Sequence, residues 1–397
     1  MTTARRPGKI AAIAGAAALA LLTTACEDAA KSAAPGKSTR SAPASDAAVQ
    51  RSIDEAVEQG IPGVQVVFSG PGGSRVLRAG TGDTATGEPI PDDARVRIGS
   101  NTKAFLAAVV MQLVDEGRVD LDGSVGHYLP GVVEGKGIDG DRITVRDLLQ
   151  HTSGLTDYVA AGKARPEDVL PGQLQVAVSE EPIGHYTPEQ LVKIAMSLPP
   201  GPGTKDMAVY SNTNYILLGM LVEKVTGHPA ADEITTRIID RLGLKNTYFP
   251  KPHETTIRGP HVHGYHRIDG KRIDVTDGDV SWGSTAGAMI GTGADLNTFF
   301  TALLRGELVS KERLAEMKRT LPLDKNPKDG YGLGLVRISN SCGKEIWGHG
   351  GGIPGFTTAG GVDPEGRAVT ITFNHVAMDE KTGEAVARAI DTTLCAK

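Results

Sequence analysis

The sequence predicts an α/β (α+β) fold in which both ends of the chain contribute strands to one sheet and a mostly helical lobe lies between them. Two observations predict it. Strand-like segments bounded by turn residues occupy positions 63–78 and return at positions 333–373, whereas the segments between them have mainly helical apolar spacing. We expect a cleft where the sheet and the helical lobe meet.

The individual elements follow from local patterns of apolar and turn residues. Residues 46–60 have helical spacing, and the strands 63–69 and 75–78 flank a Gly-Pro-Gly-Gly turn. Further helices are predicted at 144–150, 187–196, 212–225, 230–241 and 382–394. Further strands are predicted at 333–339, 345–348, 357–362 and 369–373.

The N-terminal segment predicts export. Basic residues precede the apolar stretch 10–22, and small residues follow it, a pattern that is typical of a secretory signal. Cys26, directly after Ala25, resembles the lipid-modified cysteine of bacterial lipoproteins. Thr23 stands where that pattern prefers Leu, so secretion with cleavage nearby stays an alternative. We expect a lipoprotein-type signal peptide at 1–26, a flexible linker at 27–45 and one domain at 46–397, held at the membrane only by the lipid.

Composition and cysteines add two expectations. The 397 residues are 40% hydrophobic with a formal net charge of −5, which suits a large core and argues against nucleic acid as a partner. Besides Cys26 the chain has Cys342 and Cys395. In an exported protein such a pair is most simply a disulfide, the alternative being two buried free thiols.

Chemistry is suggested first by Ser100 and Lys103, which precede a long apolar stretch that stops at Gly117. We place Ser100 in the first turn of a buried helix, so that a residue three positions later lies on the same face. A hydroxyl beside a buried amine suits a nucleophile and its proton acceptor, because burial lowers a lysine pKa. The alternative is a helix cap followed by a solvated lysine. The same spacing recurs at Ser341 and Lys344, where no helix pattern follows.

Two further constellations supply partners for Ser100. Tyr210 and Asn212 lie in a turn before a predicted helix, where a phenol can relay a proton and an amide can orient Lys103 and a substrate carbonyl. Helix capping by Asn212 is the alternative. The Trp347–Gly352 stretch places glycines after a strand, where backbone approaches a ligand closely, so an N–H there can form an oxyanion hole with that of Ser100.

Taken together, S-x-x-K, Y-x-N and H-x-G in this order resemble the motifs of the serine penicillin-recognising enzymes. The versions in this chain are similar to the class C β-lactamase-like group, and most of all to its secreted D-Ala-D-Ala carboxypeptidases. The likeness runs from about residue 50 to the end and includes the Leu148–Leu155 stretch, Ser281-Trp282, the Tyr331–Leu335 stretch and the cysteine pair. It implies a β-lactamase/transpeptidase-like fold with an antiparallel sheet.

The resemblance also implies roles for individual residues. Ser100 would be acylated, with Lys103 and Tyr210 sharing the base role. Substrate would be bound or oriented by the residues Asn212, Trp282, His349 and Gly351, and the N–H groups of Ser100 and Gly352 would form the oxyanion hole. In the segment 151–155 we expect a helix stop capped by Gly154 instead of a catalytic Ser-His pair.

Two departures from the carboxypeptidases concern the substrate. There, an Arg after the Tyr-Gly-Leu-Gly-Leu stretch binds the substrate carboxylate, and the matching position is Val336. Arg337 is next to it, but neighbouring strand residues face opposite sides. Threonines that flank the glycine of H-x-G in those enzymes are replaced by Gly350 and Gly352.

The sequence therefore predicts a monomeric serine hydrolase of the D-alanyl-D-alanine carboxypeptidase type, acting on a peptidoglycan stem peptide, a β-lactam or an ester. Esterase, β-lactamase and a non-catalytic binding module of the same fold stay alternatives. We expect no cofactor, because Gly291-Thr292-Gly293 lacks the rest of a nucleotide fingerprint. We expect no metal either, although His261, His263 and His266 are close in sequence.

Overall fold

The computed structural model describes residues 45–160, 174–175, 184–201, 203–268, 271–324, 326–376 and 380–396. The predicted signal peptide, Cys26 and nearly all of the predicted linker lie outside these residues. Within the described part of the chain, none of the helices combines the length and apolar character needed to cross a membrane.

One antiparallel sheet organises the fold, with the strand order β11-β12-β13-β14-β16-β17-β1-β2 and with β15 paired to β16. Its N-terminal strands are β1 (Gly63–Gly70) and β2 (Gly73–Gly80), and β1 pairs with β17 (Ala368–Phe373) from the other end of the chain. The remaining strands are β11 (Leu321–Leu323), β12 (Asn326–Tyr331), β13 (Val336–Ile338), β14 (Ile346–Gly348), β15 (Gly351–Ile353) and β16 (Phe356–Val362). The predicted sheet built from both chain ends is confirmed.

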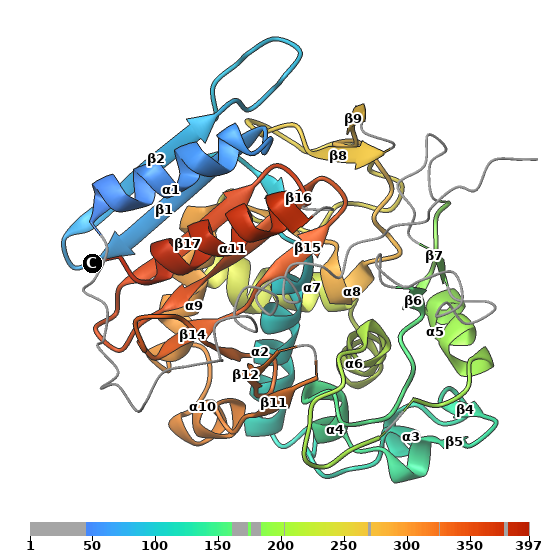
Figure 1. Ribbon diagram of the computed structural model, residues 1–397. Coiled ribbons are helices and arrows are strands. Elements are labelled where there is room, and N and C mark those ends of the chain that lie inside the picture. Colours follow the sequence, from blue (N-terminus) through green and yellow to red (C-terminus); the bar gives the residue numbers. More distant parts are fainter. Residues whose placement is uncertain are drawn as a thin grey trace, which may run out of the picture.

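Helices α1 (Asp46–Glu58) and α11 (Glu380–Leu394) lie side by side across one face of this sheet (Figure 1). The Ser45 hydroxyl caps α1 by accepting from the Ala48 N–H. The apolar face of α1, with Val49 and Ile53, is buried against the sheet and α11. This amphipathic spacing is what made both helices predictable.

The opposite face carries α2 (Thr102–Asp115) and α9 (Gly293–Leu304), with α6 (Asn212–Thr226) beyond them. Every α2 residue from Thr102 to Leu113 is buried, which explains its continuous apolar stretch. Helix α9 packs on β1, β16 and β17, and Phe299 from α9 stacks on Phe105 from α2 with ring centroids 3.7 Å apart. Helix α9 was not predicted.

The middle of the chain forms the predicted helical lobe (Figure 1). Its helices, with the short ones that connect it to the sheet, are α3 (Val125–Tyr128), α4 (Val145–Leu149), α5 (Pro188–Ser197), α7 (Ala230–Ile234), α8 (Ser284–Gly287) and α10 (Lys311–Met317). A π-helical segment (Thr235–Asp240) continues α7, and 3-10 turns cover Gly99–Asn101 and Gly140–Arg142. Small strand pairs are β3 (Val96–Arg97) with β10 (Ile290–Gly291), β4 (Glu134–Gly135) with β5 (Ile138–Asp139), β6 (Val159–Ala160) with β7 (Leu174–Gln175), and β8 (Tyr265–Ile268) with β9 (Lys271–Asp274).

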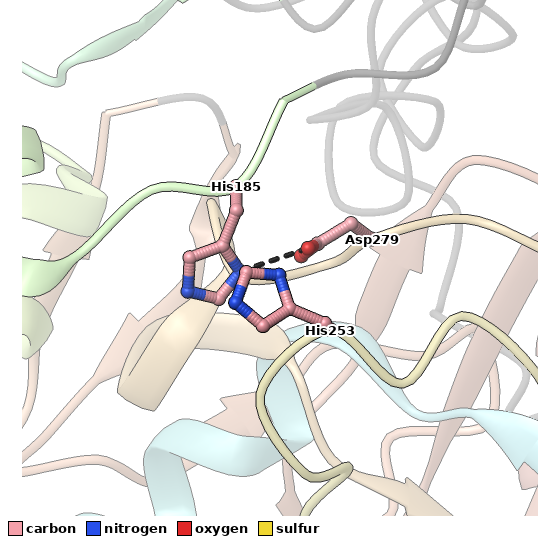
Figure 2. Close-up of side chains that lie close together, drawn as sticks. All are labelled: His185, His253 and Asp279. Atoms are coloured by element: carbon pink, nitrogen blue, oxygen red, sulfur yellow. Dashed lines mark hydrogen bonds and ion pairs between the residues drawn. The ribbon is translucent and has the colours of Figure 1, made fainter.

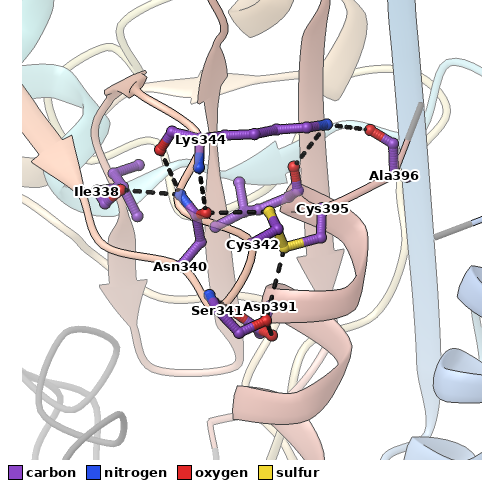
Figure 3. Close-up of a disulfide and its surroundings, with 9 residues drawn as sticks. Ile338, Asn340, Ser341, Cys342, Lys344, Asp391, Cys395 and Ala396 are labelled. Carbon is purple, nitrogen blue, oxygen red and sulfur yellow. Dashed lines mark hydrogen bonds between the residues drawn. A yellow bond between two sulfur atoms is a disulfide. The ribbon is translucent and has the colours of Figure 1, made fainter. Parts of the chain in front are cut away.

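A disulfide joins Cys342 to Cys395, with the two Cα atoms 5.8 Å apart (Figure 3). It connects the turn between β13 and β14 to the end of α11. This is the cysteine pair that the sequence predicted.

Candidate active site

Ser100 lies in the 3-10 turn that leads into α2. This differs from the prediction, which placed Ser100 in the first turn of the α-helix itself. Gly99 makes this turn possible, because its φ of 52° is in the left-handed region that favours glycine. The side-chain amide of Asn101 donates to the Thr358 hydroxyl at 2.6 Å and thereby fixes the turn to strand β16. Ser100 itself is partly exposed, whereas the residues that follow it are buried.

Lys103 is fully buried one turn later, with its Nζ 3.1 Å from the Ser100 Oγ. The same Nζ donates to the Asn212 Oδ1 and to the Ala286 carbonyl, both at 2.7 Å. Burial lowers the pKa of Lys103 to about 7, although the negative charge of Asp157 acts in the opposite direction. Because the amide and carbonyl oxygens only accept hydrogen bonds, the lone pair of a neutral Lys103 amine points to Ser100.

Asn212 is oriented by a carboxylate that the sequence did not single out. Its Nδ2 donates to the Asp157 Oδ2 at 2.9 Å, which turns its Oδ1 to Lys103. Asn212 does not cap α6, because the cap position is occupied by Ser211. Asp157 lies two residues beyond the Leu148–Leu155 stretch, but the contact joins positions 55 residues apart, so no local pattern indicates it.

The Tyr210 hydroxyl is buried beside this pair, and Lys103 Nζ lies 4.9 Å from the centroid of its ring. Burial raises the pKa of Tyr210 well above its usual value, and the Ser100 hydroxyl offsets only part of this rise. Tyr210 therefore keeps its proton at neutral pH, while Lys103 loses one readily. Of the two groups expected to share the base role, only Lys103 has a pKa near neutrality.

His151 packs against the ring of Tyr210 and contacts the start of helix α6. Its Nδ1 lies 2.9 Å from the Asn214 amide and accepts from the Ser211 N–H at 3.3 Å, and its ring centroid is 4.3 Å from that of Tyr210. The predicted helix stop is present, but Gly154 is not its cap. Helix α4 ends at Leu149, and His151 itself adopts the left-handed conformation, with φ 59°.

Strand β15 brings glycine backbone against the Ser100 turn. A Cβ added to Gly351 would lie 2.0 Å from the Ile98 carbonyl oxygen, so a larger residue does not fit there. A Cβ added to Gly99 would lie 3.0 Å from the Gly352 nitrogen. The backbone of Gly352 is thus next to the turn that carries Ser100, where the oxyanion hole was predicted.

His349 and Trp282, both predicted to bind or orient substrate, are mostly buried. His349 is 1% exposed, and its two ring nitrogens lie within hydrogen-bond distance of the Gly350 carbonyl and the Tyr331 hydroxyl. Burial lowers the pKa of His349 to about 3, so its ring is neutral. Trp282 is 8% exposed, and its carbonyl accepts from the Tyr158 hydroxyl.

The position at which the related carboxypeptidases carry an arginine is apolar here. Val336 is 2% exposed and belongs to a cluster with Leu323 and Tyr331 that Tyr210 contacts. Arg337 is exposed, in keeping with strand alternation. Val336 therefore offers no charge to a substrate carboxylate.

The three histidines considered for a metal site do not converge. The rings of His261 and His263 stack with centroids 5.7 Å apart, and His263 pairs with Asp274 at 2.6 Å. His266 is 1% exposed. Within the residues that the structure describes, these three are not part of a group able to hold a metal ion.

Comparison with known proteins identifies the family of the chain. The beta-lactamase family model matches residues 49–391. A beta-lactamase from Providencia stuartii is 28% identical over 211 residues, which are 52% of this chain and 48% of that protein. For the first four curated relatives, the aligned stretch spans only 44% to 63% of their own length.

Solved structures extend the likeness over most of the chain. A D-stereospecific amidohydrolase from Streptomyces sp. is 38% identical with a TM-score of 0.74, covering 85% of this chain and 97% of that one. A D-amino acid amidase from Ochrobactrum anthropi SV3 is 28% identical with a TM-score of 0.71, covering 87% and 97%. The chain belongs to the beta-lactamase family of serine hydrolases.

Proposed function

We propose that this protein hydrolyses uncharged amides and esters through an acyl-enzyme on Ser100, with D-amino acid amides as its main substrate class. The observation that carries the chemistry is the buried Lys103 amine 3.1 Å from the Ser100 hydroxyl. The preference for D-configured substrates rests on the likeness to the D-stereospecific amidohydrolase and the D-amino acid amidase.

In the proposed acylation, Lys103 accepts the Ser100 proton while the Ser100 Oγ attacks the substrate carbonyl carbon. The N–H groups of Ser100 and Gly352 stabilise the tetrahedral oxyanion. Tyr210 donates its proton to the leaving nitrogen and regains one from protonated Lys103. Water then attacks the acyl-enzyme, with the same groups acting in reverse order, and releases the acid.

The uncharged leaving group is inferred from Val336. A substrate that ends in a free carboxylate needs a cation or several donors, and here the relevant side chain is a buried valine. A hydrogen bond to a charged group contributes roughly 1.5–3 kcal/mol, so each missing contact reduces selectivity for a carboxylate by about tenfold or more.

A D-alanyl-D-alanine carboxypeptidase is the second candidate. A Salmonella protein provisionally named as such an enzyme is 30% identical over 174 residues, or 42% of this chain. If the present protein is such an enzyme, it must bind the terminal carboxylate of its substrate through groups other than Val336.

The test is a matched pair of substrates: an N-blocked D-Ala-D-Ala dipeptide and its C-terminal amide. They differ only in the carboxylate, and we expect the amide to be cleaved at least as well. A preference of more than about tenfold for the free acid would establish the carboxypeptidase and refute our proposal. Nitrocefin and a p-nitrophenyl ester, assayed in parallel, test for β-lactamase and esterase activity. D- and L-phenylalanine amide test the stereochemistry.

We also propose that the protein is exported and lipid-anchored at Cys26. The disulfide supports this proposal, because disulfides persist in oxidising compartments. Mass spectrometry of the native N-terminus tests it. A diacylated N-terminal Cys26 is the expected result, and an unmodified mature N-terminus elsewhere would refute the anchor.

A further inference from the structure

We propose that His185, His253 and Asp279 form a binding site for one Zn²⁺ ion. One ligand atom from each residue lies within 4.8 Å of the other two. His185 Nδ1 is 2.8 Å from the Asp279 Oδ2, and the two imidazole ring centroids are 4.0 Å apart (Figure 2). The three residues come from separate loops, which is why sequence spacing did not indicate the site.

The carboxylate is held in place for this role. Asp279 has a side chain only 14% exposed, and its Oδ1 accepts from the Ser281 N–H at 2.8 Å, which directs Oδ2 to His185. The Ser281 hydroxyl in turn accepts from the Tyr186 N–H at 2.9 Å and fastens the His185 segment to the Asp279 segment. Such second contacts orient metal ligands and support their affinity.

The loops of His253 and Asp279 are also tied to one another. Arg97, buried three positions before Ser100, donates to the Thr255 carbonyl at 2.6 Å and to the Gly278 carbonyl at 3.2 Å. His253 has a φ of 63°, an uncommon conformation for a residue other than glycine, and its ring lies on that of His185. Arg97 thus holds the loop of His253 next to the loop of Asp279.

The donor set suits zinc. Zn²⁺ is commonly bound by imidazole nitrogens and carboxylate oxygens, and three protein ligands leave a fourth position for water. The ion would replace the proton shared by His185 Nδ1 and Asp279, and the ring proton of His185 would then be on Nε2. The buried guanidinium of Arg97 interacts with the carboxylates of Glu254, Asp277 and Asp279, so its positive charge is offset.

A simple structural role makes a different prediction. If His185 and Asp279 serve only as an ion pair between two loops, His253 is a bystander and no metal binds. The third residue therefore decides between the two roles. His253→Gly is the sharpest variant, because glycine adopts a φ of 63° without strain and the loop can keep its course.

The test uses untagged full-length protein stripped with EDTA and titrated with ZnCl₂ by calorimetry, with Co²⁺ absorption as a second probe. We expect one ion per chain and a rise in the thermal unfolding midpoint, both lost in His253→Gly and in Asp279→Asn. The matched control is His263→Ala, which removes a histidine paired with Asp274 and should leave binding intact. Basal hydrolysis confirms that each variant is folded.

Absence of zinc binding to the wild type would overturn the proposal, and so would unchanged binding in His253→Gly. Binding that disappears in His263→Ala but persists in His253→Gly would assign the metal to a different histidine cluster.

Discussion

The chain contains two serines that are followed three residues later by a lysine, and their surroundings differ completely. Lys103 is fully buried with its Nζ 3.1 Å from the Ser100 Oγ. In the second pair, the Ser341 hydroxyl instead donates to the Asp391 carboxylate at 2.6 Å (Figure 3). The Lys344 amine donates to backbone carbonyls at the end of α11.

Local conformation explains the difference. Ser100 leads directly into a buried helix, where residues three apart share a face. Ser341 lies in the turn between β13 and β14, in which Gly343 has a φ of 66° and the chain reverses. Burial lowers the pKa of both lysines, but only Lys103 is fully buried, and its pKa reaches about 7. In this chain, a serine and a lysine three residues apart form a close, buried pair only where a buried helix begins.

The largest effect should come from exchanging each serine for alanine. We expect Ser100→Ala to reduce turnover by several orders of magnitude, because it removes the nucleophile. Ser341→Ala should leave kcat and KM unchanged. Steady-state assays of both variants on the same amide check this, and a comparable loss in the two would break the distinction between the pairs.

Exchanging each lysine for methionine should distinguish the two serine–lysine pairs almost as clearly. Lys103→Met removes the base and should lower kcat by about 10²–10⁴-fold. Lys344→Met loses only its hydrogen bonds to the Leu394 and Ala396 carbonyls, so its effect should be a lower thermal midpoint with normal turnover. Calorimetry and kinetics on both variants measure this. Full activity in Lys103→Met would rule out its role as base.

The pH profile sharpens the comparison further. Because the proposed base is neutral Lys103, kcat/KM should rise as pH increases through about 7 and level off above it. His349 cannot cause this change, since its pKa is lowered to about 3. The variant His349→Gln should therefore keep the midpoint. A midpoint that disappears in this variant would assign the titration to the histidine.

The smallest effect concerns Asp157, whose negative charge raises the pKa of Lys103 against the effect of burial. Asp157→Asn keeps the size of the side chain but removes the charge, so the midpoint of the pH profile should move to lower pH. A purely structural role would reduce kcat without moving that midpoint. Asp391→Asn, beside Ser341, is the matched control and should change neither value.

The sequence predicted well what depends on local pattern. The helix predicted at 212–225 is observed as Asn212–Thr226, and the strand predicted at 369–373 as Ala368–Phe373. Helix α9 was missed although Thr292 caps it by accepting from the Asp295 N–H. The glycines on both sides of Thr292 match only the start of a nucleotide fingerprint, which the chain does not complete.

Within the candidate site, sequence motifs singled out side chains that lie close together, but not the contacts that hold them there. Ser100, Lys103, Tyr210 and Asn212 lie together as predicted. The contact of Asp157 with Asn212 and that of His151 with Asn214 join positions 55 and 63 residues apart, so only the fold shows them. The apolar surroundings of Val336 likewise depend on three strands and a loop.

The central claim is that the helix-borne serine, and not its counterpart in the turn, carries the acyl group. Peptide mapping by mass spectrometry after acid quenching of the wild-type enzyme with a slowly hydrolysed ester tests this most directly. We expect one acyl group per chain, on the peptide that contains Ser100. An acyl group on the Ser341 peptide, or sustained turnover with Ser100 unmodified, would contradict this account.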